Sequence, residues 1–102
     1  MTTKELGELG ERIACEYLVK KGFNIVEKNY RISFGEIDII ARKKPKLYSR
    51  RDNTIHFIEV KAIVSNDKFF PEDRVDYHKQ RKLKQLAQIW LEKNKFSQNH
   101  PY

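Results

Sequence analysis

Three charged side chains interrupt two of the most apolar segments of this chain of 102 residues. Asp38 lies within residues 37–41, and Glu59 and Lys61 lie within residues 55–63. Both segments are short, rich in β-branched residues and bounded by turn-forming or basic sequence, which predicts two central strands. Because burying charge in a strand costs free energy unless the charge is paired or bound, these side chains are the first candidates for chemistry.

The chemistry available to these side chains depends on how the two strands pair. Side chains alternate along a strand, so Glu59 and Lys61 share one face, and Asp38 points away from the face of Ile37 and Ile39. Pairing that brings Asp38 near Glu59 would place two carboxylates beside one ammonium group. Carboxylate oxygens suit Mg²⁺ or Mn²⁺, which take one or two protein carboxylates and leave room for water and substrate phosphates. Such an ion activates water and polarises phosphoryl oxygens, and Lys61 could position the water or stabilise the developing charge, which predicts phosphodiester hydrolysis.

A second interpretation of the same residues is structural. A lysine opposite a glutamate or aspartate on a half-exposed face is an ordinary cross-strand contact. Buried ionic groups can also serve folding rather than chemistry. The spacing of Glu59 and Lys61 therefore needs a third element before it favours a metal site.

The first helix supplies a third carboxylate. It is expected to span residues 3–21, and a capping box of Thr2 with Glu5 starts it. Its apolar residues recur at helical spacing: Leu6, Leu9, Ile13, Tyr17 and Leu18. At about 100° per residue, Glu11 falls at the edge of this stripe, one turn after Gly7, whose missing side chain leaves room, so Glu11 could face the sheet. The alternative is a boundary residue whose carboxylate extends to solvent.

Several segments follow one another in an order typical of a known family. They are Gly10-Glu11, Asn29-Tyr30-Arg31, Gly35-Glu36-Ile37-Asp38-Ile39-Ile40 and Phe57-Ile58-Glu59-Val60-Lys61. In these segments the chain resembles the YraN-type family of small bacterial proteins, which is similar to archaeal Holliday-junction resolvases of the PD-(D/E)XK nuclease superfamily. The resemblance covers roughly residues 5–91. It implies that Asp38 and Glu59 are metal ligands, that Lys61 is the catalytic lysine, and that Glu11 completes the site or holds a metal-bound water.

The resemblance also implies an α/β fold with a restriction-endonuclease-like core, in which helices flank a small mixed sheet in the order α-β-β-β-α. Two departures limit what is implied. Ile63 stands where the family commonly has a basic residue, so the phosphate contact expected there is not implied. The further β segment that usually follows the last helix has no counterpart before Tyr102. The sheet is therefore expected to lack this segment or to be completed by a partner chain, and a homodimer would present two sites to a branched substrate.

Positive charge is concentrated in two stretches of a chain whose formal net charge is +7. One stretch follows the second strand and the other opens the last helix: Arg42, Lys43, Lys44, Lys46, Arg50 and Arg51, then Lys79, Arg81, Lys82 and Lys84. Basic clusters of this kind neutralise nucleic-acid phosphates and release counterions, which gives affinity without sequence preference. DNA is therefore the expected partner, and the alternatives are a solvated surface or an acidic protein partner.

A single domain is expected over residues 1–94, followed by a frayed tail over residues 95–102. Its strands are expected over residues 24–30, 36–42 and 54–63, and the last helix carries one apolar stripe: Leu83, Leu86, Ala87, Trp90 and Leu91. No signal peptide or apolar run of membrane-spanning length is present, which predicts a cytoplasmic protein without a membrane partner. Cys15, opposite the apolar stripe of the first helix, is interpreted as incidental, and the histidines are not spaced for a zinc site.

Together these features predict a metal-dependent endonuclease-like protein that hydrolyses DNA, including branched or junction DNA. The competing hypothesis is a nucleic-acid-binding module of the same fold without catalysis. The four candidate residues, Glu11, Asp38, Glu59 and Lys61, are all present. Their presence favours the enzyme, because decay of a catalytic site usually removes at least one residue.

Overall fold

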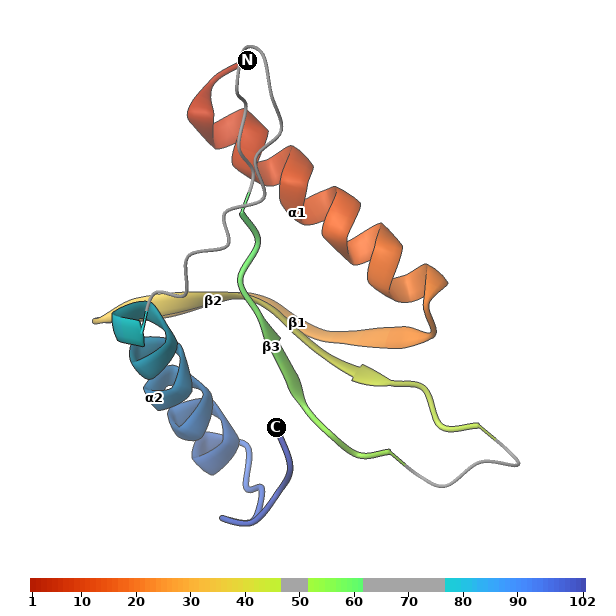
Figure 1. Ribbon diagram of the computed structural model, residues 1–102, viewed down its shortest axis with the longest axis vertical. Coiled ribbons are helices and arrows are strands. Elements are labelled where there is room, and N and C mark those ends of the chain that lie inside the picture. Colours follow the sequence, from red (N-terminus) through yellow and green to blue (C-terminus); the bar gives the residue numbers. More distant parts are fainter. Residues whose placement is uncertain (47–51, 62–76) are drawn as a thin grey trace.

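The computed structural model describes residues 1–46, 52–61 and 77–102. They form α1 (Thr3–Lys20), β1 (Phe23–Ile32), β2 (Gly35–Lys43), β3 (His56–Ile58) and α2 (Tyr77–Lys93), which confirms the predicted order α-β-β-β-α. Figure 1 shows the sheet between the two helices. Among the described residues, no helix combines the length and the apolar character needed to cross a membrane. Arg50, Arg51 and the predicted third strand beyond residue 61 lie outside the described residues.

The sheet has the strand order β1-β2-β3. Both of its described pairings are antiparallel, where a mixed sheet was expected. A tight turn at Ser33 and Phe34 joins β1 to β2, and so short a connection allows only antiparallel pairing. β1 has one irregularity, between Ile25 and Glu27, and pairs with β2 again from there to its end.

β3 is shorter than the strand predicted over residues 54–63. It pairs with β2 from His56 to Ile58. Two residues later, the backbone N–H of Val60 donates a hydrogen bond of 2.8 Å to Oδ2 of Asp38. Because this amide bonds to a side chain rather than to the β2 backbone, the regular ladder does not continue. Glu59 and Lys61 therefore lie beyond β3 instead of within it.

The hydrophobic core lies between the sheet and α2. It contains three isoleucines from the sheet side and three residues of α2: Ile37, Ile40, Ile55, Leu86, Trp90 and Leu91. The ring of Trp90 stacks with Phe96 at 5.6 Å and meets Phe57 edge-on at 5.7 Å. Leu86, Ala87, Trp90 and Leu91 are buried, which confirms that part of the predicted apolar stripe.

α1 covers the opposite side of the sheet more loosely. None of its residues is buried, and Ile13 and Tyr17 of its predicted apolar stripe are 56% and 59% exposed. Its half-buried residues toward the sheet include Glu11 and Cys15, one turn apart. Cys15 thus lies on the sheet side of α1 and not opposite it, and burial raises the pKa of its thiol.

Residues 95–102, expected to fray, contact the rest of the domain. Lys95 adopts a left-handed backbone with a φ of 63°, and the N–H of Phe96 donates to the carbonyl of Leu91 at 3.0 Å, as in a Schellman ending. The chain then returns beside β3, where the N–H of Ile55 donates to the carbonyl of Pro101 at 3.0 Å. The Tyr102 ring meets Phe57 edge-on at 6.0 Å. Aromatic packing and backbone hydrogen bonds hold this segment.

Candidate metal and nucleic-acid site

Asp38 lies where the alternation of side chains along β2 changes. Ile37 and Ile40 both belong to the core cluster that packs on α2. Residues three apart in a regular strand point to opposite faces. The strict alternation that the sequence analysis assumed around Asp38 is therefore interrupted, and half-buried Asp38 stands between the two faces of the sheet.

The same change occurs on β1, at Asn29. The register of the neighbouring pairs places Asn29 opposite Asp38, and the φ of Asn29 is 54°, in the left-handed region. On one side of it, Glu27 accepts a hydrogen bond of 3.3 Å from Nε1 of Trp90 in α2. On the other side, Tyr30 packs against the core cluster under the same helix. On both strands, the alternation of side chains between the two faces of the sheet is thus interrupted, at Asn29 on β1 and at Asp38 on β2.

Asp38 also holds the segment that carries Glu59. The hydrogen bond from Val60 ties this segment to β2, and the β2–β3 register, extended by one residue, sets Glu59 opposite Asp38. Both carboxylates line a hollow of about 440 Å³ beside the start of α2. Lys79 and Lys82 line the same hollow from α2. Glu36 lines it as well, so three carboxylates and two lysines share one concave surface.

Glu11 lines a second hollow, on the α1 side of Asp38. This hollow measures about 740 Å³ and lies between α1 and the first two strands. Oε1 of Glu11 accepts a hydrogen bond of 3.0 Å from Nδ2 of Asn29. Glu11 therefore faces the sheet, as its position on the helix indicated. Asp38 lines both hollows, so it lies between Glu11 on one side and Glu59 on the other.

The donors around Asp38 fit Mg²⁺ or Mn²⁺ through two carboxylates. Asp38 and Glu59 line one hollow, and Mg²⁺ usually takes one or two protein carboxylates and keeps several waters. Among the residues that the structure describes, no group of three or more His, Cys, Asp or Glu side chains could hold a metal ion. Glu11 is therefore in the neighbouring hollow and not part of a closed three-carboxylate cluster. Metal binding by Glu11, Asp38 and Glu59 stays a prediction.

Lys61 has an exposed side chain beyond the end of β3. It lines neither the hollow of Asp38 and Glu59 nor the hollow of Glu11. The alternation expected to set Lys61 beside Glu59 requires a strand, and the described strand ends at Ile58, three residues before Lys61. The lysines that line the Asp38 hollow are Lys79 and Lys82. The catalytic role of Lys61 stays a prediction.

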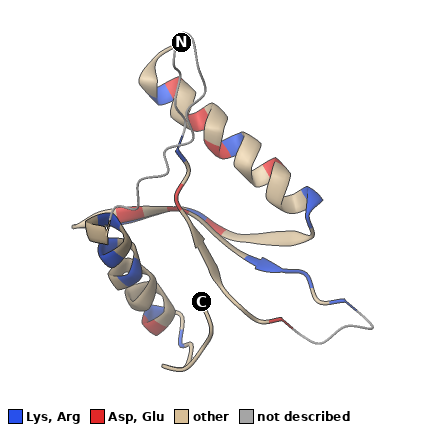
Figure 2. Cartoon of the chain, viewed as in Figure 1, with Lys and Arg blue, Asp and Glu red and all other residues tan. Residues whose placement is uncertain are grey.

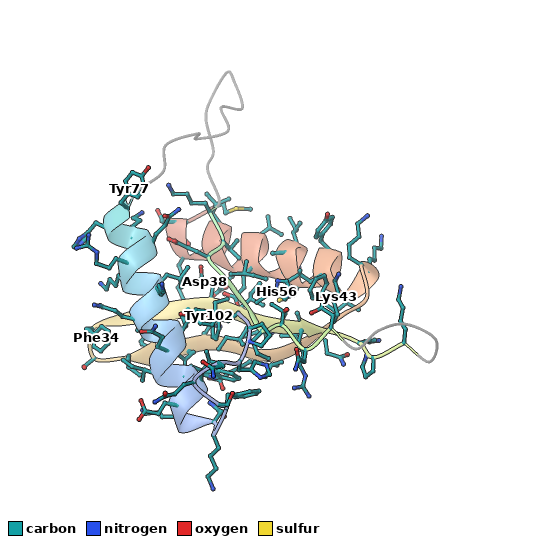
Figure 3. All side chains as sticks on the ribbon, turned by 60° about the horizontal axis from the view of Figure 1, so that its bottom comes forward. Phe34, Asp38, Lys43, His56, Tyr77 and Tyr102 are labelled. Carbon is teal, nitrogen blue, oxygen red and sulfur yellow. The ribbon has the colours of Figure 1, made fainter. Side chains whose placement is uncertain are left out.

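The basic stretch after β2 lies away from Asp38. Lys43 is five residues further along the same strand, which corresponds to about 17 Å. Figure 3 shows Asp38 between Lys43 and Tyr77, the first residue of α2. Figure 2 shows the basic residues of α2 and those at the end of β2 in separate regions. The two basic stretches thus form two surfaces, and Arg50 and Arg51 lie outside the described residues.

The end of β2 meets the end of α1. The N–H of Lys44 donates a hydrogen bond of 2.8 Å to the carbonyl of Gly22, two residues after α1 ends. This contact places the end of α1 beside the end of β2. We call the six cations of these two segments the basic end: Lys20, Lys21, Arg42, Lys43, Lys44 and Lys46.

Sequence reasoning assigned no role at the site to Asn29, and none in DNA binding to Lys20 and Lys21 at the end of α1. Alternation of residue types cannot reveal a left-handed residue in a strand, although asparagine is one of the few types that adopt this conformation readily. Lys20 and Lys21 lie more than 20 residues before Lys43, and the pairing of β1 with β2 is what joins them.

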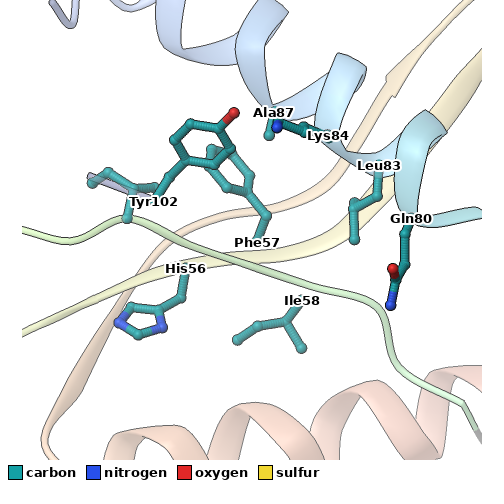
Figure 4. Close-up of a pocket in the computed structure, with 9 residues that line it drawn as sticks. His56, Phe57, Ile58, Gln80, Leu83, Lys84, Ala87 and Tyr102 are labelled. Atoms are coloured by element: carbon teal, nitrogen blue, oxygen red, sulfur yellow. The ribbon is translucent and has the colours of Figure 1, made fainter. Parts of the chain in front are cut away.

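A third hollow, of about 320 Å³, lies between β3 and α2. Figure 4 shows Phe57, Leu83 and Tyr102 among the side chains that line it. It holds none of the predicted metal ligands or catalytic residues. Its largely apolar lining makes it unsuited to a divalent ion or a phosphate group.

Comparisons with known proteins agree with the expected bacterial family. A family model described as "Uncharacterised protein family UPF0102" matches residues 10–100. A UPF0102 protein of Caldanaerobacter subterraneus subsp. tengcongensis is 42% identical over 98 residues, which cover 96% of this chain and 74% of that protein. A UPF0102 protein of Thermodesulfovibrio yellowstonii is 46% identical over 91 residues, which cover 89% of this chain and 74% of that protein. A UPF0102 protein of Clostridioides difficile is 42% identical over 95 residues, which cover 92% of this chain and 75% of that protein. The chain is thus a member of the family UPF0102.

Proposed function

We propose that this chain is a metal-dependent endonuclease-like protein that acts on DNA by phosphodiester hydrolysis. The observation that carries the proposal is the shared hollow in which Asp38 and Glu59 lie opposite Lys79 and Lys82. Carboxylates that bind a divalent ion and lysines that bind phosphate oxygens are the two components that such hydrolysis needs. The formal net charge of +7 supports a polyanionic substrate.

Each residue has a distinct part in the proposed reaction. Asp38 and Glu59 would hold Mg²⁺ or Mn²⁺, and this ion would stabilise the charge that develops on the phosphoryl oxygens. Lys79 and Lys82 would bind the phosphates on either side of the scissile bond. Glu11 would complete the donor set or orient the attacking water from the α1 side. Lys61, on the segment held by Asp38, would stabilise the developing charge.

A non-catalytic nucleic-acid-binding module is the second candidate. Two observations favour it: Lys61 lines neither hollow, and the described residues contain no cluster of three metal-ligating side chains. In this alternative, the basic end and the α2 lysines bind DNA, and the carboxylates serve the fold.

The finer features of the proposal concern substrate, assembly and location. The similarity of the motifs to those of Holliday-junction resolvases suggests branched DNA as the preferred substrate. A homodimer would present two sites to such a junction, and the exposed Ile13, Tyr17 and Val19 of α1 offer apolar surface for it. A protein that acts on chromosomal DNA would have to be in the cytoplasm, so the proposal includes this location.

A cleavage assay tests the proposal. Purified protein with millimolar Mn²⁺ is incubated with four-way-junction, flap, single-stranded and duplex DNA, beside the variants Glu59→Gln and Lys61→Ala. Lys93→Ala is the matched control, because Lys93 is also an exposed lysine but lies in the last turn of α2, on a different element from the segment that Asp38 holds. Loss of a group positioned at a phosphoryl centre typically lowers the rate by about 100-fold or more.

The outcomes separate the two candidates. Cleavage by the parent and by Lys93→Ala that disappears in the other two variants supports the nuclease. Binding of DNA and Mn²⁺ without cleavage of any substrate supports the non-catalytic module. Equal cleavage by all four proteins indicates a contaminating enzyme and removes the evidence for catalysis by this chain.

A further inference from the structure

Asn29 has an unusual conformation for a residue in a strand. Its φ is 54°, yet the residues on both sides of it remain paired with β2. Only a few residue types adopt this region readily, asparagine and glycine foremost. The backbone at this position thus favours asparagine or glycine, and the side chain of asparagine adds an amide that glycine lacks.

The amide of Asn29 links the sheet to α1. Its Nδ2 donates a hydrogen bond of 3.0 Å to Oε1 of Glu11. α1 contains no buried residue, so apolar packing alone holds its side chains weakly in place. The bond therefore defines the direction in which the Glu11 carboxylate points.

The hydrogen bond between Asn29 and Glu11 lies at the hollow that Asp38 also lines. Register places Asn29 opposite Asp38 on the neighbouring strand, and Glu11, Asn29 and Asp38 line the same hollow. Asp38 in turn holds the segment of Glu59 through the N–H of Val60. A continuous series of side-chain contacts and strand pairing thus runs from α1 across the sheet to the segment beyond β3.

We propose that Asn29 is a positioning residue that holds the carboxylate of Glu11 at the Asp38 hollow. Its left-handed backbone turns the side chain out of the regular pleat of β1, and its amide fixes Glu11 on the side of Asp38 away from Glu59. For its effect on metal binding, the inference rests on the proposed function. The positioning itself concerns the protein without any metal, so the two can be tested separately.

The first test uses NMR spectra of the protein without metal. Glu11→Ala should shift the side-chain amide signals of Asn29, and Asn29→Gly should shift the side-chain carboxyl signal of Glu11. Glu8→Ala is the control, because Glu8 lies one turn earlier on α1 and lines the same hollow. It should leave the Asn29 amide signals unchanged. Absence of both shifts would overturn the inference, whatever the activity of the protein.

The second test compares two substitutions that remove the same amide. Glycine tolerates the left-handed backbone, whereas alanine is strained in it. Asn29→Ala should therefore lower the melting temperature more than Asn29→Gly. Both should weaken Mn²⁺ binding equally, by about 10-fold, because partners that orient a ligand typically contribute that much. If Asn29→Ala weakens Mn²⁺ binding more than Asn29→Gly does, in parallel with its larger loss of stability, the role of Asn29 is structural alone. That result would overturn the positioning role.

A double variant completes the test. If Asn29 acts through Glu11, Asn29→Gly should weaken Mn²⁺ binding no further once Glu11→Ala is present. Additive effects would show that Asn29 acts independently of Glu11 and would contradict the inference. If the parent binds no Mn²⁺, the proposed function fails, and the NMR shifts alone decide whether Asn29 holds Glu11.

Discussion

Replacement of Asp38 separates its contribution to the fold from its proposed role as a metal ligand. Its Oδ2 accepts the N–H of Val60 at 2.8 Å, and Asp38→Ala removes this acceptor. Hydrogen bonds to charged groups contribute about 1.5–3 kcal/mol. Asp38 is only half-buried, so we expect the lower end, about 1.5 kcal/mol, which lowers the melting temperature of a domain of this size by about 6–12 °C. Asp38→Asn keeps an oxygen acceptor and loses only the charge, so it should lower the melting temperature by less than half as much.

Addition of Mn²⁺ tests the proposed role of Asp38 as a metal ligand. At ten times its dissociation constant, a ligand that binds only the folded state stabilises it by about 1.4 kcal/mol. The melting temperature of the parent should then rise by about 6–11 °C. Asp38→Asn should abolish this rise, because an amide oxygen is a much weaker ligand for the ion than a carboxylate.

Asp52→Asn is the matched control for this experiment. The Oδ1 of Asp52 also accepts a backbone hydrogen bond, from Thr54 at 3.1 Å, and this bond is the main reason that the pKa of Asp52 is lowered. Asp52 lies outside the Asp38 hollow, so its variant should keep the full Mn²⁺ response. Differential scanning fluorimetry of the four proteins, with and without Mn²⁺, provides the measurement. An Mn²⁺ response in Asp38→Asn equal to that of the parent would refute the assignment of Asp38 as a ligand. Equal melting temperatures of Asp38→Ala and Asp38→Asn without metal would refute the stabilising hydrogen bond between Asp38 and the N–H of Val60.

Three further predictions concern the DNA surface, the contact of β2 with α2, and Cys15. Charge reversal of Lys20 with Lys43, or of Lys79 with Lys82, should each flatten the log-log salt dependence of DNA binding by about two units; an unchanged slope for either pair would exclude that surface. Gly35→Ala should destabilise the fold by about 1–3 kcal/mol in urea unfolding, because its Cβ would come within 3.0 Å of Leu86 Cδ1 in the core. Gly7→Ala, with nothing within 4 Å, should instead stabilise it by about 0.5–1 kcal/mol, and equal effects would contradict the packing described. Burial raises the pKa of the Cys15 thiol, so less thiolate is present at a given pH. Iodoacetamide at about pH 8 should therefore alkylate the native chain several-fold more slowly than the urea-unfolded chain. Equal rates would place Cys15 in solvent.

The elements that sequence alone could predict are those with a strong local pattern of apolar residues. The stripe of Leu86, Ala87, Trp90 and Leu91 recurs at helical spacing, and these residues are buried in α2. The apolar run around Asp38 forms β2, whose Ile37, Ile39 and Ile40 are almost completely buried. The helical stripe is predictive because one face of α2 packs on the core, and the run around Asp38 is predictive because a short, apolar, β-branched segment favours a buried strand.

The geometry of the candidate site depends on features that periodicity does not encode. The left-handed backbone of Asn29 coincides with a change of face on both strands, which no alternation rule anticipates. The carboxylate of Asp38 takes the N–H of Val60, so β3 ends before the predicted Glu59 and Lys61 positions. The composition of the tail contained a partial signal, because aromatic rings tend to pack on other rings, as Phe96 does on Trp90 and Tyr102 on Phe57.

The most direct test of the central claim is a crystal structure of the protein in Mn²⁺, with anomalous diffraction measured to locate the ion. We expect a peak in the hollow between Asp38 and Glu59, about 2.1 Å from a carboxylate oxygen of each residue. A fully occupied Mn²⁺ at other carboxylates, or a hollow without a peak at saturating Mn²⁺, would contradict the claim that Asp38 and Glu59 form a metal site.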